Sequence, residues 1–136
     1  MLHPYEEKIR EKINKIANED IYFKPSEIMQ KSEDVVDNII CELLSDACCG
    51  QNVLPIEISR KLLLTFPKKW ISSKIKKIAF RSIDINDDWD YRRLLELSEL
   101  ISKELLIWAI ALSDNSENPD IIEASYDFKL TLKNRL

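Results

Sequence analysis

The sequence contains a single glycine, Gly50, among 136 residues. Phosphate-cradling loops, dinucleotide-binding turns and nucleophile elbows all need glycine where the backbone adopts a positive φ or approaches a ligand closely. Two-residue β-hairpin turns have the same requirement. A chain with one glycine and abundant Leu, Ile, Glu and Lys is therefore expected to be all-α and to lack these motifs.

Histidine and cysteine are also scarce, because His3 is the only histidine and the cysteines are Cys41, Cys48 and Cys49. An odd number of closely spaced cysteines is a poor disulfide framework, and a zinc site would need further ligands. We interpret the three as reduced residues in or near the core. No serine or cysteine lies at a helical spacing from a histidine, so nucleophilic and histidine-based catalysis are disfavoured. We expect a protein that is not an enzyme and has no cofactor, metal or small-molecule substrate.

Long hydrophobic runs are absent. The longest, around "ELLIWAIAL", is about half the roughly 18 residues that a membrane span needs. The N-terminal segment is charged from residue 6 onward and has no apolar region of the signal-peptide type. We therefore expect no membrane association and a cytoplasmic location. With 45% hydrophobic and 32% charged residues, residues 1–136 are expected to form one domain.

Apolar residues recur at helical spacing along most of the chain and predict six to seven helices. Ser32, Ser102 and Asn118 are the expected N-caps, and Gly50 is expected to end a helix in the left-handed conformation. The expected helices span residues 4–17, 33–49, 55–66, 67–82, 89–101, 103–112 and a last segment from 119, with a short turn at 26–31.

Short links between helices of about 12 residues indicate antiparallel neighbours. A shift of 30 residues aligns four identical pairs, among them Asp84 with Asp114 and Asp90 with Asp120, which supports stacking of similar units. The expected fold is a HEAT-like helical stack or an irregular bundle. Its N-terminal helices would occupy about 4–50, and stacked helical hairpins would occupy about 55–136.

Charge is segregated along the chain although the net charge is only −4. Residues 59–83 hold eight basic residues and no acidic one, whereas residues 84–127 hold twelve acidic residues and three basic ones. Blocks of this kind create strong local fields. Each block is a candidate binding surface.

The basic block has a face that could contact phosphates, with Trp70 nearby as a stacking ring. A pI near 5.1 and the absence of any nucleic-acid-binding motif argue against direct nucleic-acid binding. The alternative interpretation is a solvated face, or a positive lining that pairs with acidic helices. The residues of this alternative basic face are Lys68, Lys69, Lys74, Lys76, Lys77 and Arg81.

One interpretation of the acidic block is a calcium-binding loop. Asp84, Asn86 and Asp88 stand at positions 1, 3 and 5 of an EF-hand pattern. Position 6 is then Trp89 in place of glycine, and position 12 is Leu95 in place of the bidentate glutamate. Because two indispensable positions fail, we expect no calcium site.

The second interpretation of the acidic block is a docking surface for a cationic protein. Two acidic loops would lie on one edge if successive helical units stack, and such an edge speeds association with a basic partner. Helix capping and the helix dipole explain several of these acids without any partner, so both interpretations stay open. The candidate partner-binding residues are Asp84, Asp87, Asp88, Asp90, Asp114, Glu117 and Asp120, together with Trp89, Tyr91 and Arg92, which are residue types found at binding hot spots.

The stretch "DDWDYRRLLELSELISKELLIWAIALSDNSENPDIIEASYDF" resembles the C-terminal half of small helical immunity proteins of bacterial polymorphic and contact-dependent growth-inhibition toxin systems. The shared features are an acidic loop, the "YRRLLEL" helix, a second helix ending in a polar turn, and "NPDIIEASYDF" opening the last helix. The resemblance covers residues 87–128. It implies a cytoplasmic inhibitor without catalytic residues that occludes a cognate toxin domain, and many such toxins are nucleases with basic surfaces. The rival expectation is a helical scaffold or adaptor that binds nucleic acid or a regulatory protein through the basic face.

Overall fold

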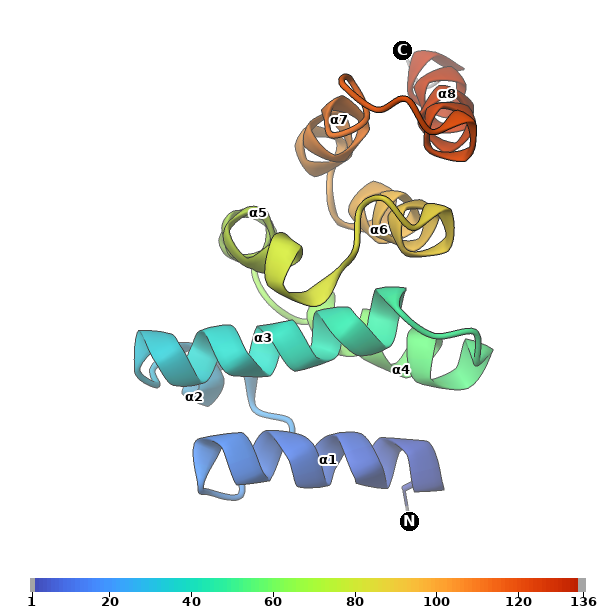
Figure 1. Cartoon of the computed structure of the whole chain (residues 1–136). Coiled ribbons are helices and arrows are strands. Elements are labelled where there is room, and N and C mark those ends of the chain that lie inside the picture. Colours follow the sequence, from blue (N-terminus) through green and yellow to red (C-terminus); the bar gives the residue numbers. More distant parts are fainter. Residues whose placement is uncertain (1, 135–136) are drawn as a thin grey trace.

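The computed structural model describes residues 2–134, and within them the chain forms eight α-helices and no strand (Figure 1). The all-α prediction is confirmed, with one helix more than the upper expected number. The additional helix is the short α2, in the region where only a turn was expected. The helices are α1 (Pro4–Ala17), α2 (Pro25–Met29), α3 (Glu33–Cys48), α4 (Val53–Leu63), α5 (Lys68–Ser82), α6 (Asp88–Ile101), α7 (Lys103–Ala111) and α8 (Pro119–Asn134).

The expected N-caps are confirmed at three helices. The Ser32 hydroxyl accepts a hydrogen bond from the backbone N–H of Val35 at 3.4 Å. Ser102 accepts one from Leu105 at 3.1 Å, and the Asn118 side chain accepts one from Asp120 at 3.0 Å. Each bond satisfies a backbone donor that the first helical turn cannot satisfy internally. The positions of α3, α7 and α8 therefore follow from local sequence signals.

The expectation for Gly50 is wrong, because no glycine adopts a positive φ in the described part of the chain. α3 ends at Cys48, and its C-cap Cys49 has a φ of −109°. The Gly50 carbonyl instead accepts a hydrogen bond from the Trp89 indole at 2.9 Å. The residue that does adopt the left-handed conformation is Asn18, at a φ of 54°, after α1. Asparagine tolerates this region better than most residues.

The start of α4 also differs from the expectation, which placed it at Pro55. The helix begins at Val53, because the Asn52 side chain accepts a hydrogen bond from the Leu54 N–H at 3.3 Å and acts as the cap. Pro55 then falls in the first turn, where its missing N–H has no intrahelical partner to lose. The segment "QNVLP" was expected to be a connection, and its last three residues are helical instead.

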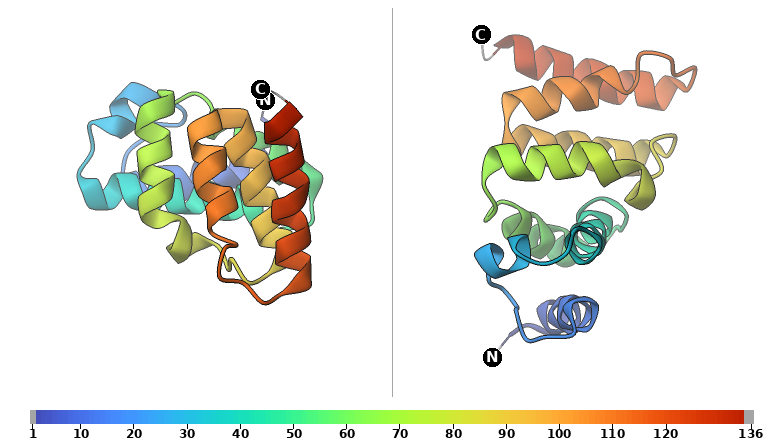
Figure 2. Two further views of the ribbon diagram at one scale, coloured as in Figure 1. Left: turned by 90° about the horizontal axis from the view of Figure 1, so that it is seen from above. Right: turned by 90° about the vertical axis from the view of Figure 1, so that its left-hand side faces the viewer.

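The helices form two sets whose axes cross steeply. In Figure 1, α1 and α3 lie across the view, whereas α5 to α8 are seen close to end-on. Figure 2 shows the layers one above another, with α1 at one end and α7 and α8 at the other. The central α3 packs against α1, α4, α5 and α6. The fold is therefore only roughly the antiparallel stack that we expected, because the helix axes change direction between the two sets.

Buried apolar residues form a main cluster that extends from Ile9 on α1 to Leu105 on α7. A second cluster lies between α6, α7 and α8 and includes Leu95, Ile110 and Ile121. These two clusters fix α5 to α8 relative to α3, and thereby set the positions of the loops that join their ends.

None of the helices in residues 2–134 has both the length and the apolar character that a bilayer crossing requires.

Candidate partner-binding edge

The two acidic loops lie side by side at one edge of the molecule. They connect α5 to α6 and α7 to α8, and both project on the same side of the layers in Figure 2. The Asn118 side-chain amide donates a hydrogen bond to the Asn86 carbonyl at 3.3 Å, which ties one loop to the other. The sequence-based expectation that stacking would bring these loops together therefore agrees with the structure. We call residues 84–90 and 114–120 the acidic edge.

Three carboxylates of the acidic edge are used within the loop itself. The Asp87 side chain caps α6 by accepting hydrogen bonds from the N–H groups of Trp89 at 2.9 Å and Asp90 at 3.1 Å. Asp84 accepts from Asn86 N–H at 3.0 Å, and Asp90 accepts from the Asp84 N–H at 3.3 Å. These bonds give the loop its shape, so the local explanation of its acidity holds for these residues.

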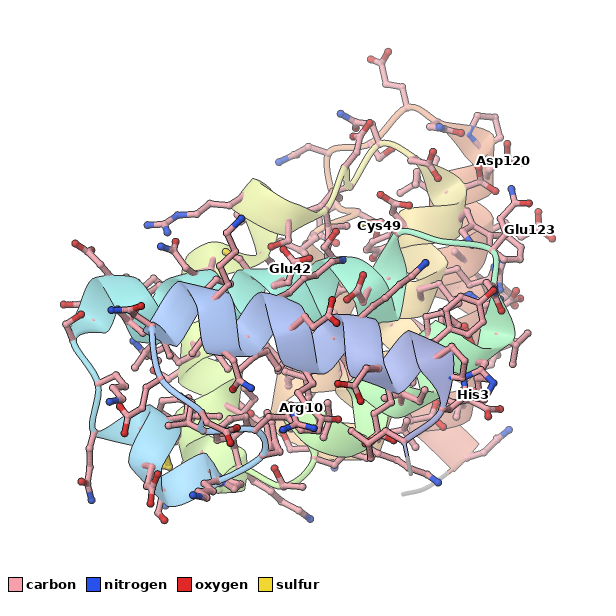
Figure 3. The ribbon with its side chains drawn as sticks, turned by 90° about the horizontal axis from the view of Figure 1, so that it is seen from below. His3, Arg10, Glu42, Cys49, Asp120 and Glu123 are labelled. Atoms are coloured by element: carbon pink, nitrogen blue, oxygen red, sulfur yellow. The ribbon has the colours of Figure 1, made fainter. Side chains whose placement is uncertain are left out.

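Four other carboxylates of the acidic edge are exposed and have no ion pair or side-chain hydrogen bond within residues 2–134. They are Asp88, Asp114, Glu117 and Asp120. In Figure 3, Asp120 and the nearby Glu123 lie at the periphery of the molecule. Unpaired carboxylates on two adjoining loops concentrate negative potential at one edge, and a partner can reach all of them.

The three residues proposed as binding hot spots, Trp89, Tyr91 and Arg92, make most of their contacts within the protein. Tyr91 is fully buried, and its hydroxyl donates to the Ala109 carbonyl at 2.7 Å, so the expectation that it faces a partner is wrong. Arg92 pairs with Asp127 of α8 at 3.0 Å.

Trp89 remains partly accessible, although its contacts are largely internal. The side chain is 41% exposed. The Arg93 guanidinium lies 4.4 Å from the ring centroid, and the indole N–H is bonded to Gly50. Trp89 therefore joins α6 to the end of α3 and offers only part of its ring to a partner.

An aromatic residue that is not among the candidates expected from the sequence lies beside the acidic edge. Phe80 is 63% exposed on α5 and borders an open hollow of about 580 Å³, whose lining also includes Asp84, Asn86 and the basic side chain of Arg81. The apolar stripe of α5 runs through Ile71, Ile75 and Ile78, which already places position 80 off the buried face. That mismatch between residue type and helical position is the signal that could have identified Phe80.

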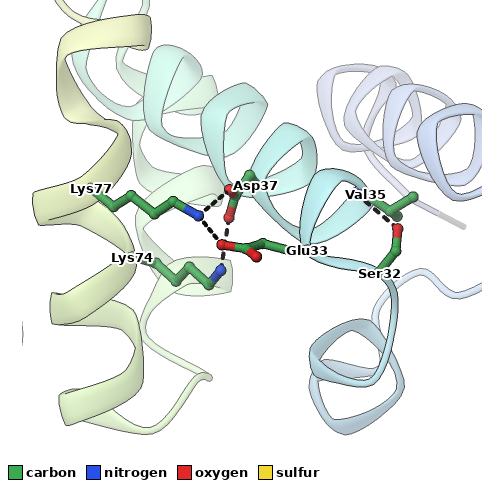
Figure 4. Close-up of polar contacts among 6 residues, drawn as sticks. All are labelled: Ser32, Glu33, Val35, Asp37, Lys74 and Lys77. Atoms are coloured by element: carbon green, nitrogen blue, oxygen red, sulfur yellow. Dashed lines mark hydrogen bonds and ion pairs between the residues drawn. The ribbon is translucent and has the colours of Figure 1, made fainter.

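The basic face is substantially neutralised from within. Lys74 and Lys77 each lie 2.8 Å from the carboxylate of Asp37 on α3, and Lys77 also pairs with Glu33 (Figure 4). Lys76 pairs with Glu104 of α7 at 3.1 Å. Three of the six candidate residues therefore serve as a positive lining between helices. Lys68, Lys69 and Arg81 have no ion-pair partner in the described part of the chain.

Asp37 is the buried member of this network, with only 5% of its side chain exposed. Burial raises the pKa of its carboxyl, but the hydrogen bonds from Lys74 and Lys77 outweigh burial and hold the pKa below its ordinary value. The carboxylate is therefore charged at neutral pH and joins α3 to α5. Its lysine partners are thus part of the fold.

The three cysteines are free thiols in the structure. Burial raises the pKa of the Cys49 thiol to about 12, with a further contribution from a hydrogen bond to Asp90. Burial also raises the pKa of Cys48 far above its ordinary range. Both groups are protonated at neutral pH, which makes them poor nucleophiles. Among residues 2–134, no group of three or more His, Cys, Asp or Glu side chains is arranged to hold a metal ion.

Comparison of the chain with protein-family models, with characterised proteins and with solved structures gives no match.

Proposed function

We propose that this protein is an immunity-type inhibitor, whose acidic edge docks on the basic surface of a cognate bacterial toxin domain. The toxin class comes from the resemblance of residues 87–128 to immunity proteins, and we propose a nuclease because its substrate cleft would be basic. Binding would take place in the cytoplasm and would occlude the toxin's active site or its access to substrate. The protein itself would perform no chemistry.

The observation that carries this proposal is the Asn118–Asn86 contact, which aligns two acidic loops into one edge. The exposed carboxylates of Asp88, Asp114, Glu117 and Asp120 have no partner in the described chain, so their charge is available to an incoming cationic surface. Charges of this kind steer association and disfavour partners of the wrong sign. The expected partner surface therefore has lysines or arginines spaced to meet both loops.

Phe80 supplies the apolar contact that an acidic surface alone lacks. Aromatic anchors surrounded by polar groups typically carry a large share of the binding energy at an interface. Because Phe80 is exposed beside Asp84, a partner that covers the acidic loops can also bury this ring. The proposed interface thus combines an apolar anchor with a charged rim.

Co-expression tests the proposal. The toxin domain would be the C-terminal part of the large secreted protein encoded by the adjacent upstream gene, expressed in a bacterial host with or without this protein. Wild-type protein should restore growth, and the purified pair should form a complex. A domain that arrests growth equally in the presence of this protein would contradict the proposal, and so would an upstream gene that encodes no such secreted protein.

Two single substitutions assign the surface. Phe80→Ala should weaken the complex by about tenfold or more, as expected for loss of an aromatic anchor. Leu100→Ala is the matched control, because Leu100 is 51% exposed on α6 and is not part of the acidic edge. Equal losses for both variants, or a loss caused instead by Lys68→Ala, would place the interface elsewhere and favour the basic face.

A further inference from the structure

A second hollow, of about 420 Å³, lies between the N-terminal end of α5 and the start of α7. α5 has 15 residues and is therefore about 22 Å long, so this hollow and the acidic edge lie at its opposite ends. In Figure 2 the connections α4–α5 and α6–α7 lie on the side opposite the acidic loops. We call it the lysine–serine hollow, after its lining: Lys68, Lys69, Lys76, Ser72, Ser73 and Ser102, with Glu104 as the acidic member.

The first turn of α5 contributes two lysines to the lining of the hollow. Lys68 and Lys69 are exposed there and have no ion pair in the described chain. No side chain caps this helix and no acidic residue stands in its first turn, so its amides receive no acceptor from a capping residue. Two lysines at the positive end of a helix dipole repel it. An anion placed here would relieve that repulsion.

The interior of the hollow offers a hydroxyl without a partner. Ser72 is only 7% exposed, and its side chain makes no hydrogen bond within residues 2–134. It nevertheless lines the hollow, where a bound acceptor could receive its proton. Its oxygen is not one of the fully buried unpaired atoms of the described residues, so it is accessible from the hollow and its hydroxyl can donate to a ligand oxygen there.

The far wall contains the only opposing charge among the lining residues. Glu104 pairs with Lys76 at 3.1 Å, and its side chain is 79% exposed, so it lies at the rim. Three lysines against one glutamate leave the lining with a net positive charge. Ser102 caps α7 through its oxygen and keeps its hydroxyl proton available to donate.

We propose that the lysine–serine hollow binds a dianionic phosphate group, either free or carried by a small organic ligand. A phosphate accepts hydrogen bonds on all sides, and the unpaired lysines, the serine hydroxyls and the uncapped α5 amides are all donors. The site involves no residue of the acidic edge, so it goes beyond the proposed inhibitor function and can be tested without any protein partner.

The test is calorimetric titration of the full chain with inorganic phosphate and with AMP, at constant ionic strength set by chloride. Saturable binding is expected, accompanied by a rise in the thermal unfolding midpoint. Lys68→Ala with Lys69→Ala should weaken binding by about tenfold or more, as expected when charge-assisted hydrogen bonds are lost. Similar affinities would identify free phosphate as sufficient, whereas tighter binding of AMP would indicate an organic phosphate.

Two further variants and a matched control sharpen the result. Ser72→Ala should weaken binding without lowering the unfolding midpoint, and Glu104→Gln should strengthen it by removing the opposing charge. The control is Lys129→Ala with Lys133→Ala, which removes two exposed charges from α8. Absence of saturable binding, equal weakening in the control, or binding only by a long RNA would overturn the proposal.

Discussion

At the scale of single residues, some acidic side chains form contacts between helices, whereas others are exposed and unpaired. Asp37 and Asp46 both lie on α3, yet their pKa values are displaced in opposite directions. Hydrogen bonds from two lysines overcome burial at Asp37 and lower its pKa. Burial dominates at Asp46 and raises its pKa, because Lys12 lies 3.8 Å away and one carboxylate oxygen has no hydrogen bond in the described chain.

Asp37→Asn is therefore expected to destabilise the protein by about 1–2 kcal/mol at pH 7, because the amide cannot replace a carboxylate between Lys74 and Lys77. The lowered pKa means that this stabilisation is present above the ordinary aspartate value of 3.8 and is lost as the pH falls through the folded-state pKa. Denaturant unfolding followed by circular dichroism between pH 2.5 and about pH 7 measures both effects.

Asp46→Asn is the matched control for that experiment. The raised pKa of Asp46 means that its ionisation opposes folding above pH 3.8, so the substitution should leave stability at pH 7 unchanged or slightly higher. Equal destabilisation by the two variants would show that the Asp37–lysine network does not have the assigned role.

Tyr91 is expected to contribute to stability and not to partner binding. Its hydroxyl bonds to the carbonyl at the end of α7, beside the hydrogen bond between Ser113 and Ser125 at 2.7 Å. Tyr91→Phe should cost about 1 kcal/mol of unfolding free energy by removing that bond. Binding of the toxin domain should not change, because the ring is buried. A loss of affinity with unchanged stability would contradict this placement.

At the scale of helices and loops, Asn118 has two separable roles. Its side-chain oxygen caps α8, and its amide nitrogen reaches the Asn86 carbonyl of the neighbouring acidic loop. Asn118→Ala removes both contacts and should cost about 1 kcal/mol of unfolding free energy. Asn118→Ser keeps a capping oxygen but is too short to tie the loops.

Comparison of these two variants measures the contribution of the tie. Asn118→Ser should retain most of the stability while the association rate with the toxin domain falls, because the two loops would no longer be held in one orientation. Stopped-flow association kinetics and thermal unfolding provide the two values. An unchanged association rate would mean that the alignment of the loops does not matter for binding.

The helices were predictable from sequence wherever a local signal fixes them. Ser102 and Asn118 begin α7 and α8 as expected, because capping is a contact within four residues. The prediction that Gly50 is a left-handed C-cap was wrong, because the contacts of Gly50 involve Trp89, which is 39 residues away in sequence. The pairing of Asp37 with Lys74 and Lys77, and the burial of Tyr91, also depend on helices that meet only after folding. The periodicity of apolar residues predicts which face of a helix is buried. It does not predict which residue of another helix packs against that face.

At the scale of the whole molecule, the lysine–serine hollow lies at the N-terminal end of α5 and the acidic edge lies at its C-terminal end. Most of the basic block is divided between internal ion pairs and the lysine–serine hollow, whereas Arg81 lies at the other end of α5, in the hollow beside Asp84. The acidic block is divided between loop-shaping hydrogen bonds and the exposed carboxylates of the acidic edge. The molecule therefore presents surfaces of opposite sign on opposite sides, despite a net charge of only −4. A cationic partner is expected to approach in one orientation.

The most direct test is the dissociation constant of the complex with the toxin domain for two triple variants of equal charge. One variant carries Asp88→Lys, Asp114→Lys and Glu117→Lys on the acidic edge. The other carries Glu11→Lys, Asp34→Lys and Glu57→Lys at exposed acids elsewhere. The first should bind about a hundredfold more weakly than wild type at low salt, with a smaller difference at high salt. The second should bind nearly as wild type does. Equal weakening by both variants would contradict docking through the acidic edge.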